Sequence, residues 1–185
     1  MENTLTPETR AMLQHVLATL AYRTQKALRG APDDFADFSA GAGVRTPREL
    51  VRHMASVIGY ARTFFVGGVF RAEPLADFNG EVERFHGIVA DFAQILNAGE
   101  IKEITPAQLL QGPLSDAMTH AGQLALLRRL AGSPVASENF IFAEVSAERL
   151  HSAQALPAAP TPVWMGRVIG LAWSVAKLTA RLRRK

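Results

Sequence analysis

Between Asp77 and Asn97, large apolar residues recur at alternating intervals of four and three positions, a periodicity that places them on one side of an α-helix. The stripe consists of Phe78, Val82, Phe85, Val89, Phe92 and Leu96. A helix with such a stripe must bury it against other elements of the fold. This segment therefore predicts one helix of a helix bundle.

Two Thr-Pro pairs mark where further helices begin. Threonine suits the N-cap and proline the first helical position, as in Thr6-Pro7 and Thr46-Pro47, and Glu49 completes a capping box in the second pair. The predicted helices run from Pro7 to about Gly30, from Pro47 to about Gly67, from about Asp77 to Asn97 and from after Pro113 to Leu130, with a short helical turn near Thr105. No strand pattern competes with them, so the sequence predicts an all-α four-helix bundle with an additional C-terminal helix.

Proline and charge divide the chain into three parts. We predict a bundle over residues 1–150, a Pro-rich linker over 151–162 and a basic amphipathic C-terminal helix over 163–185. Seven of the 20 Lys and Arg residues lie in 149–185, where no acidic residue occurs, so residues 1–148 carry 13 basic residues against 17 acidic ones. The net charge of +3 thus belongs to the tail. Because the body has no basic stripe interleaved with aromatic residues, we expect no nucleic-acid partner.

The C-terminal helix has two predicted uses. It packs on the bundle or on a partner subunit, or it contacts an anionic membrane surface through Trp164 and the basic residues at its end. Arg167 and Lys177 interrupt its apolar run, so we do not expect it to cross a membrane. The first ten residues contain acids and no apolar run, which predicts no signal peptide and a cytoplasmic location.

Three residues form a candidate site for a divalent metal ion. Asp116 and His120 are four residues apart, so they lie one turn apart on one face of the predicted fourth helix. His53 lies within the apolar stripe of the second helix and supplies a third ligand if these two helices adjoin. The chain has no cysteine, so a metal here must use imidazole, carboxylate or water. Two histidines and one carboxylate leave a coordination position open, as in catalytic sites.

Other interpretations of these residues stay open. Asp116 lies in the first helical turn, where the helix dipole alone favours an acid, and the two histidines could be buried and bonded to backbone or to each other. Gln123 could hold a metal ligand or a bound water in place, or it could form a hydrogen bond to a neighbouring helix. His15 and His86 flank apolar stripes, and we expect them to be partly exposed helix-edge residues.

Three segments of the chain resemble the DinB/YfiT-like superfamily of metal-binding helical bundles. They are TPRELVRHM at 46–54, DAMTHAGQLALLRRLAG at 116–132 and ENF at 138–140, within a resemblance spanning about residues 5–150. Members have one histidine early in the second helix and an H-x-x-x-H pair in the fourth, commonly followed by glycine and glutamine. His53 and His120 match the first and last histidines, and Gly122-Gln123 follow. Asp116 departs from the pattern, although members similar to mycothiol-dependent isomerases use a carboxylate there.

The resemblance implies a function and its partners. It implies a metal-dependent hydrolase or thiol S-transferase that uses water or a thiolate activated by a divalent ion, zinc or nickel. The expected partners are a small-molecule substrate or low-molecular-weight thiol and a second copy of the chain in a homodimer. The alternative is a non-catalytic bundle that binds a small molecule or a partner and keeps only a vestigial metal site.

Overall fold

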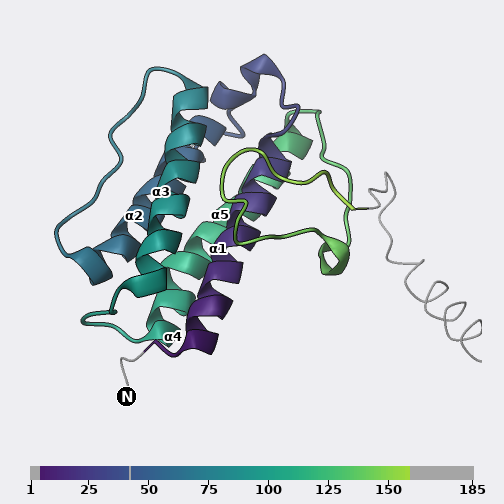
Figure 1. Cartoon of the computed structure of the whole chain (residues 1–185). Helices are drawn as coiled ribbons and strands as arrows, with labels where there is room; N and C mark the ends of the chain where they lie inside the picture. The colour runs from purple at the N-terminus through teal and green to yellow at the C-terminus, as the bar shows by residue number, and fades with distance from the viewer. Residues whose placement is uncertain (1–4, 42, 159–185) are drawn as a thin grey trace, which may run out of the picture. The chain divides into compact units, whose positions relative to one another are not determined.

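The computed structural model describes residues 5–41 and 43–158 and confirms the all-α class. Four long helices pack together: α1 (Pro7–Leu28), α2 (Pro47–Val66), α3 (Phe78–Ala98) and α5 (Ser115–Leu130) (Figure 1). The short α4 (Pro106–Leu109) precedes α5. The predicted C-terminal helix over 163–185 lies outside the described residues. Among the described residues, no helix has the length and apolarity needed to cross a membrane.

The predicted helix starts are confirmed by their capping hydrogen bonds. The hydroxyls of Thr6 and Thr46 accept from the backbone N–H three residues on, and Glu49 completes the capping box at Thr46. Asp77 caps α3 in the same way through Gly80 N–H. Each cap satisfies a backbone donor that the first helical turn leaves unpaired, and so fixes the residue at which the helix begins.

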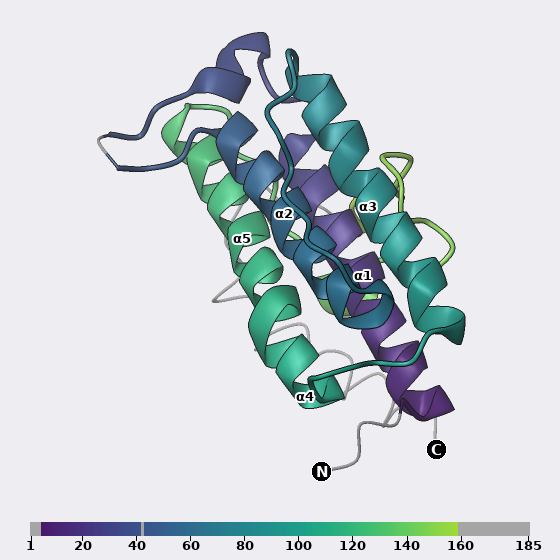
Figure 2. The same cartoon turned by 90° about the vertical axis from the view of Figure 1, so that its left-hand side faces the viewer.

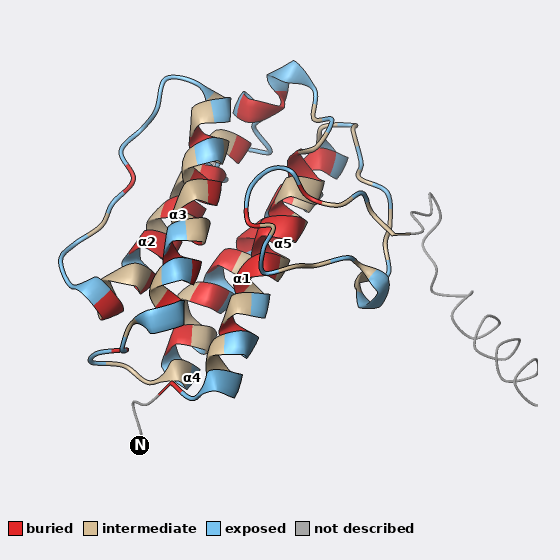
Figure 3. Cartoon of the chain, viewed as in Figure 1, coloured by how far each residue is buried: buried red, intermediate tan, exposed pale blue. Residues whose placement is uncertain are grey.

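The order of the helices around the bundle places α2 beside α5. α2 contacts both α3 and α5, and α1 contacts the same two helices, so α1 and α2 lie across the bundle from each other. The long connection over 67–77 returns to the end of the bundle where α2 begins, so α2 and α3 run in the same direction (Figures 1 and 2). The apolar faces turn inward and form one core, with Phe85, Phe92 and Met54 fully buried (Figure 3).

A kinked segment joins α4 to α5, and α5 begins just after Pro113, as the sequence predicted. Within residues Leu110–Leu114 the chain is kinked at Gly112, whose backbone angles are non-helical (φ −85°, ψ −105°). Pro113 has no N–H to donate, and the Ser115 hydroxyl donates to Leu110 O at 2.7 Å. The chain therefore leaves the helical conformation at Gly112 and starts a new helix after Pro113.

A buried arginine joins the ends of α1 and α5. Arg128 on α5 is 4 % exposed. Its guanidinium donates to Ala27 O (2.9 Å), Arg29 O (3.1 Å) and Gly30 O (3.1 Å), and its Nε donates to Ser133 O (2.9 Å). Ala27 lies in the last turn of α1, and Arg29 and Gly30 follow its end, where no later turn supplies donors. Arg128 therefore acts as a C-cap delivered from another helix.

The described residues fall into two compact units. The first comprises the bundle up to residue 135 together with residues 145–156. The second contains residues 136–144 and the described residues after 156. Within it, the Asn139 side chain accepts from Ile141 N–H at the start of a short 3₁₀ turn (Phe140–Phe142), and Glu138 accepts from Ala158 N–H. The predicted domain boundaries stay a prediction.

His86 is buried, and the prediction of a partly exposed helix-edge residue was wrong. Its side chain is 2 % exposed on α3, with Nδ1 2.8 Å from Leu150 O and Nε2 3.2 Å from the Gln25 amide. The physical reason is the segment 145–156, whose return over α3 no helical periodicity could reveal. His15, in contrast, is exposed as predicted.

We expect the stability of the bundle to fall as the pH drops below about 6.5. Burial, above all, lowers the pKa of His86, a hydrogen bond to Leu150 O opposes this, and nearby His151 adds to the lowering. Between the folded pKa and 6.5 the unfolded chain binds more protons, so acidification destabilises the fold. Urea unfolding with a chelator present, at about pH 7.5 and about pH 5.5, measures this loss.

The matched variant is His86→Gln, which keeps a hydrogen-bonding side chain but does not titrate. Its stability should fall less than that of the wild type over the same interval. Equal losses in both proteins would contradict the role given to His86.

Candidate metal centre

The contact between α2 and α5 brings His53, Asp116 and His120 together, as the sequence predicted. Each residue offers one ligand atom, and the three atoms lie within 4.8 Å of one another. Asp116 Oδ1 lies 3.3 Å from His120 Nε2, and Asp116 Oδ2 lies 3.9 Å from His53 Nε2. Tetrahedral zinc with metal–ligand distances of about 2.0–2.2 Å separates its ligand atoms by about 3.3–3.6 Å. The 3.3 Å Asp116–His120 spacing fits this range, whereas His53 Nε2 lies farther out, 3.9 Å from Asp116 Oδ2.

His120 is the ligand whose orientation is best defined. Its Nδ1 lies 3.1 Å from Gln123 Oε1, one turn further along α5. Because an amide oxygen only accepts, this contact is a hydrogen bond in the tautomer that carries the proton on Nδ1, which leaves the lone pair on Nε2. That Nε2 is buried and has no hydrogen-bond partner among the described residues. A buried acceptor without a donor is costly, and a metal ion at this point would satisfy it.

His53 lies at the edge of the core and not within it, with 31 % of its side chain exposed. Burial is the main cause that lowers its pKa, with Arg45 and His120 adding to the effect and Asp116 opposing it. The ring is therefore neutral at neutral pH, which is the form that binds a metal.

The other interpretations of the triad can be compared with these contacts. The rings of His53 and His120 meet edge to face at 4.8 Å between centroids, without a mutual hydrogen bond among the described contacts. His120 bonds to the Gln123 side chain and not to backbone. Asp116 does lie in the first turn of α5, but its carboxylate faces both histidines. Helix-dipole stabilisation alone would not require that orientation.

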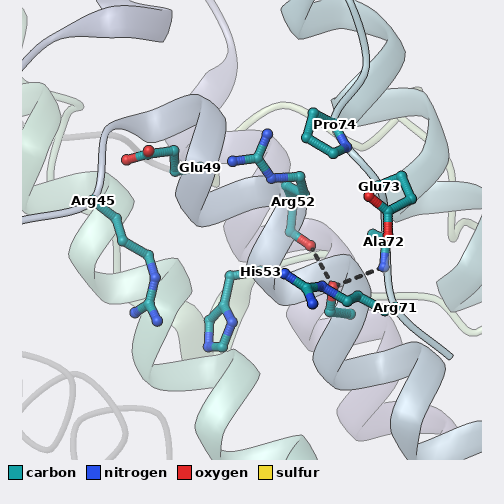
Figure 4. Close-up of a pocket in the computed structure, with 9 residues that line it drawn as sticks. Arg45, Glu49, Arg52, His53, Arg71, Ala72, Glu73 and Pro74 are labelled. Carbon is teal, nitrogen blue, oxygen red and sulfur yellow. Dashed lines mark hydrogen bonds between the residues drawn. The ribbon is translucent and has the colours of Figure 1, made fainter. Parts of the chain in front are cut away.

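A cavity of about 300 Å³ opens on the α2 side of His53 (Figure 4). Its polar lining comes from α2 and from the two loops that flank it, and includes Arg45, Arg52, His53, Ser56 and Arg71. Arg45 and Arg71 could not be predicted as part of the site, because loop residues carry no periodicity. Both residues come close to His53 only through the folded paths of the two loops. Only their basic side chains close to a candidate ligand could have drawn attention to them.

Comparison of the chain with protein-family models, with curated proteins and with solved structures finds no match. The structure shows four packed helices with a candidate His/Asp/His metal site. Because the comparisons add no relative, the family resemblance rests only on the sequence motifs at 46–54, 116–132 and 138–140.

Proposed function

We propose that this chain is a divalent-metal-dependent enzyme of the DinB/YfiT-like superfamily, a hydrolase or a thiol S-transferase, with the metal held by His53, Asp116 and His120. The observation that carries the proposal is His120, whose buried Nε2 is oriented by Gln123 toward Asp116 and lacks a donor. Zinc or nickel suits two imidazoles and one carboxylate.

Three residues would hold the metal ion, and a fourth would position one of these ligands. Two neutral imidazoles and one carboxylate neutralise part of a divalent charge and leave about +1 at the site. A divalent ion in such a site makes a water or thiol a better nucleophile near neutral pH. Gln123 fixes the His120 ring, and the cavity beside His53 offers space for a substrate such as a low-molecular-weight thiol. The predicted homodimer stays a prediction.

A second candidate function is non-catalytic binding of a small molecule or partner. The observation that favours it is Asp116, whose side chain is 49 % exposed and shorter than the histidine of the common motif. An exposed carboxylate holds a metal less firmly than a buried one. In that case the triad is a weak or vestigial site.

The first test is the metal content of the purified chain. We expect about one zinc or nickel ion per chain by elemental analysis after dialysis, because three ligands converge on one point. The His15→Ala variant removes an exposed histidine remote from the triad and should keep the same content. A wild-type chain that binds neither zinc nor nickel on titration would reject the metal site.

A screen of the metal-loaded chain separates the two candidate functions. Turnover of low-molecular-weight thiols with electrophilic acceptors, or of simple esters, supports the enzyme. Firmly bound metal without turnover across both substrate classes favours the binding role.

A further inference from the structure

The cavity beside His53 is lined by three arginines whose charges are not equally compensated. Arg52 lies 3.8 Å from the buried carboxylate of Glu81, which also pairs with Arg84. Arg45 and Arg71 are exposed and have no ion-pair partner in the described part of the chain. Two guanidinium groups beside one cavity are therefore available to an anion.

The acids of the same cavity do not cancel these two charges. Glu49 is engaged at the start of α2, where its Oε2 accepts from Thr46 N–H at 2.9 Å. Glu73 lies on the exposed loop and forms no ion pair with Arg45 or Arg71 in the described part of the chain. In Figure 4 Arg45 and Arg71 extend toward His53 from opposite sides. The cavity thus has a positive side next to the candidate ligand.

The loop that carries Arg71 is held in place by several contacts. Phe70 packs against Gly59 so closely that a Cβ on this glycine would lie 2.0 Å from the ring. Ala72 N–H donates to Ser56 Oγ at 3.0 Å, and Leu75 N–H donates to Glu81 Oε1 at 2.9 Å. Such anchoring fixes the backbone on both sides of Arg71. The guanidinium is thereby presented to the cavity by an ordered loop.

We propose that Arg45 and Arg71 bind the carboxylate of a small substrate whose other end reaches the metal at His53. Guanidinium groups match the planar geometry of a carboxylate and form charge-assisted hydrogen bonds with it. The inference rests on the proposed function, because it uses the metal as the second anchor. It restricts the substrate class to small molecules that carry an anionic group and a metal-binding or reacting group a few bonds apart.

The experiment uses the full chain loaded with cobalt, whose absorption reports both metal binding and thiolate coordination. The probes are mercaptoacetate, 3-mercaptopropionate and 4-mercaptobutanoate, each compared with the neutral mercapto-alcohol of the same length. We expect at least one acid to bind about tenfold more tightly than its alcohol. The preference should shrink as the NaCl concentration rises, since both arginines are exposed.

The test variant is R45A/R71A, and the matched control is K102A/R129A, which removes the same charge from exposed positions outside the cavity. The first should lose the preference for the acid while keeping the cobalt spectrum, and the second should keep both. Cobalt binding with equal affinity for acids and alcohols would overturn the inference and leave the proposed function standing.

Absence of a cobalt spectrum would instead reject the proposed function. Calorimetry of inorganic phosphate with the metal-free chain then tests the arginines alone. Phosphate binding that R45A/R71A removes supports the anion site, and no phosphate binding overturns it.

Discussion

Replacing both His53 and His120 by alanine is expected to weaken zinc binding by more than about a hundredfold. Loss of a single outer partner of a metal ligand already costs about 10–100-fold, and this variant removes two ligands themselves. Only the exposed carboxylate of Asp116 would remain, and one carboxylate does not retain zinc against a chelator. Competition with a chromophoric chelator measures the affinity, and circular dichroism checks that the helices remain.

Two substitutions of Asp116 test whether its carboxylate is the third ligand. Asp116→Ala should weaken binding, whereas Asp116→His supplies an imidazole in place of the carboxylate and should keep the ion. Full zinc occupancy in the double histidine variant would show that the ion is held elsewhere.

Replacing Arg128 by methionine is expected to destabilise the fold by about 2–4 kcal/mol. Methionine retains an apolar stem, so the loss isolates the guanidinium, which bonds to the carbonyls of Ala27, Arg29 and Gly30 and lies over the Phe35 ring. Buried acceptors left without donors each cost about 1–3 kcal/mol, and partial access of water reduces the sum. The change is a large share of the about 5–15 kcal/mol of a typical domain. Urea unfolding measures it.

The neighbouring arginine is the control for Arg128. Arg129 is exposed, and Arg129→Ala should change stability by no more than about 0.5 kcal/mol. Arg128→Lys keeps the charge but presents one compact donor group, so it should recover only part of the loss. A stable Arg128→Met variant would mean that water replaces the guanidinium at the end of α1.

The helices were predictable because their starts and their periodicity are local properties. Thr46 and Glu49 specify the start of α2, and the stripe from Phe78 to Leu96 specifies the buried face of α3. The burial of His86 was not predictable, since it depends on Leu150, which is 64 residues away in sequence. Nor was the role of Arg128, because its acceptors belong to the end of another helix.

Some residues of the candidate site could likewise be predicted from the sequence, and others could not. Asp116, His120 and Gln123 share one face of one helix, so their spacing predicted their proximity. His53 was a candidate from its place on the second helix, but only the resemblance indicated that this helix adjoins the fourth, since periodicity cannot say which helices adjoin. Arg45 and Arg71 approach His53 only through loops, whose paths depend on tertiary contacts such as that of Phe70 with Gly59.

The kinked segment before α5 determines in which direction Asp116 and His120 point from that helix. Leu109 and Leu114 are both fully buried, although residues five apart on a regular α-helix point about 140° apart. The non-helical angles of Gly112 break the regular helix between these two residues, so α4 and α5 both bury their apolar residues. Deleting one residue here would rotate α5 relative to α4, by about 100° for each helical residue removed. The chain would then have to choose between burying Leu109 and keeping Asp116 and His120 opposite His53, so the length of this segment is as much a determinant of the site as the ligands.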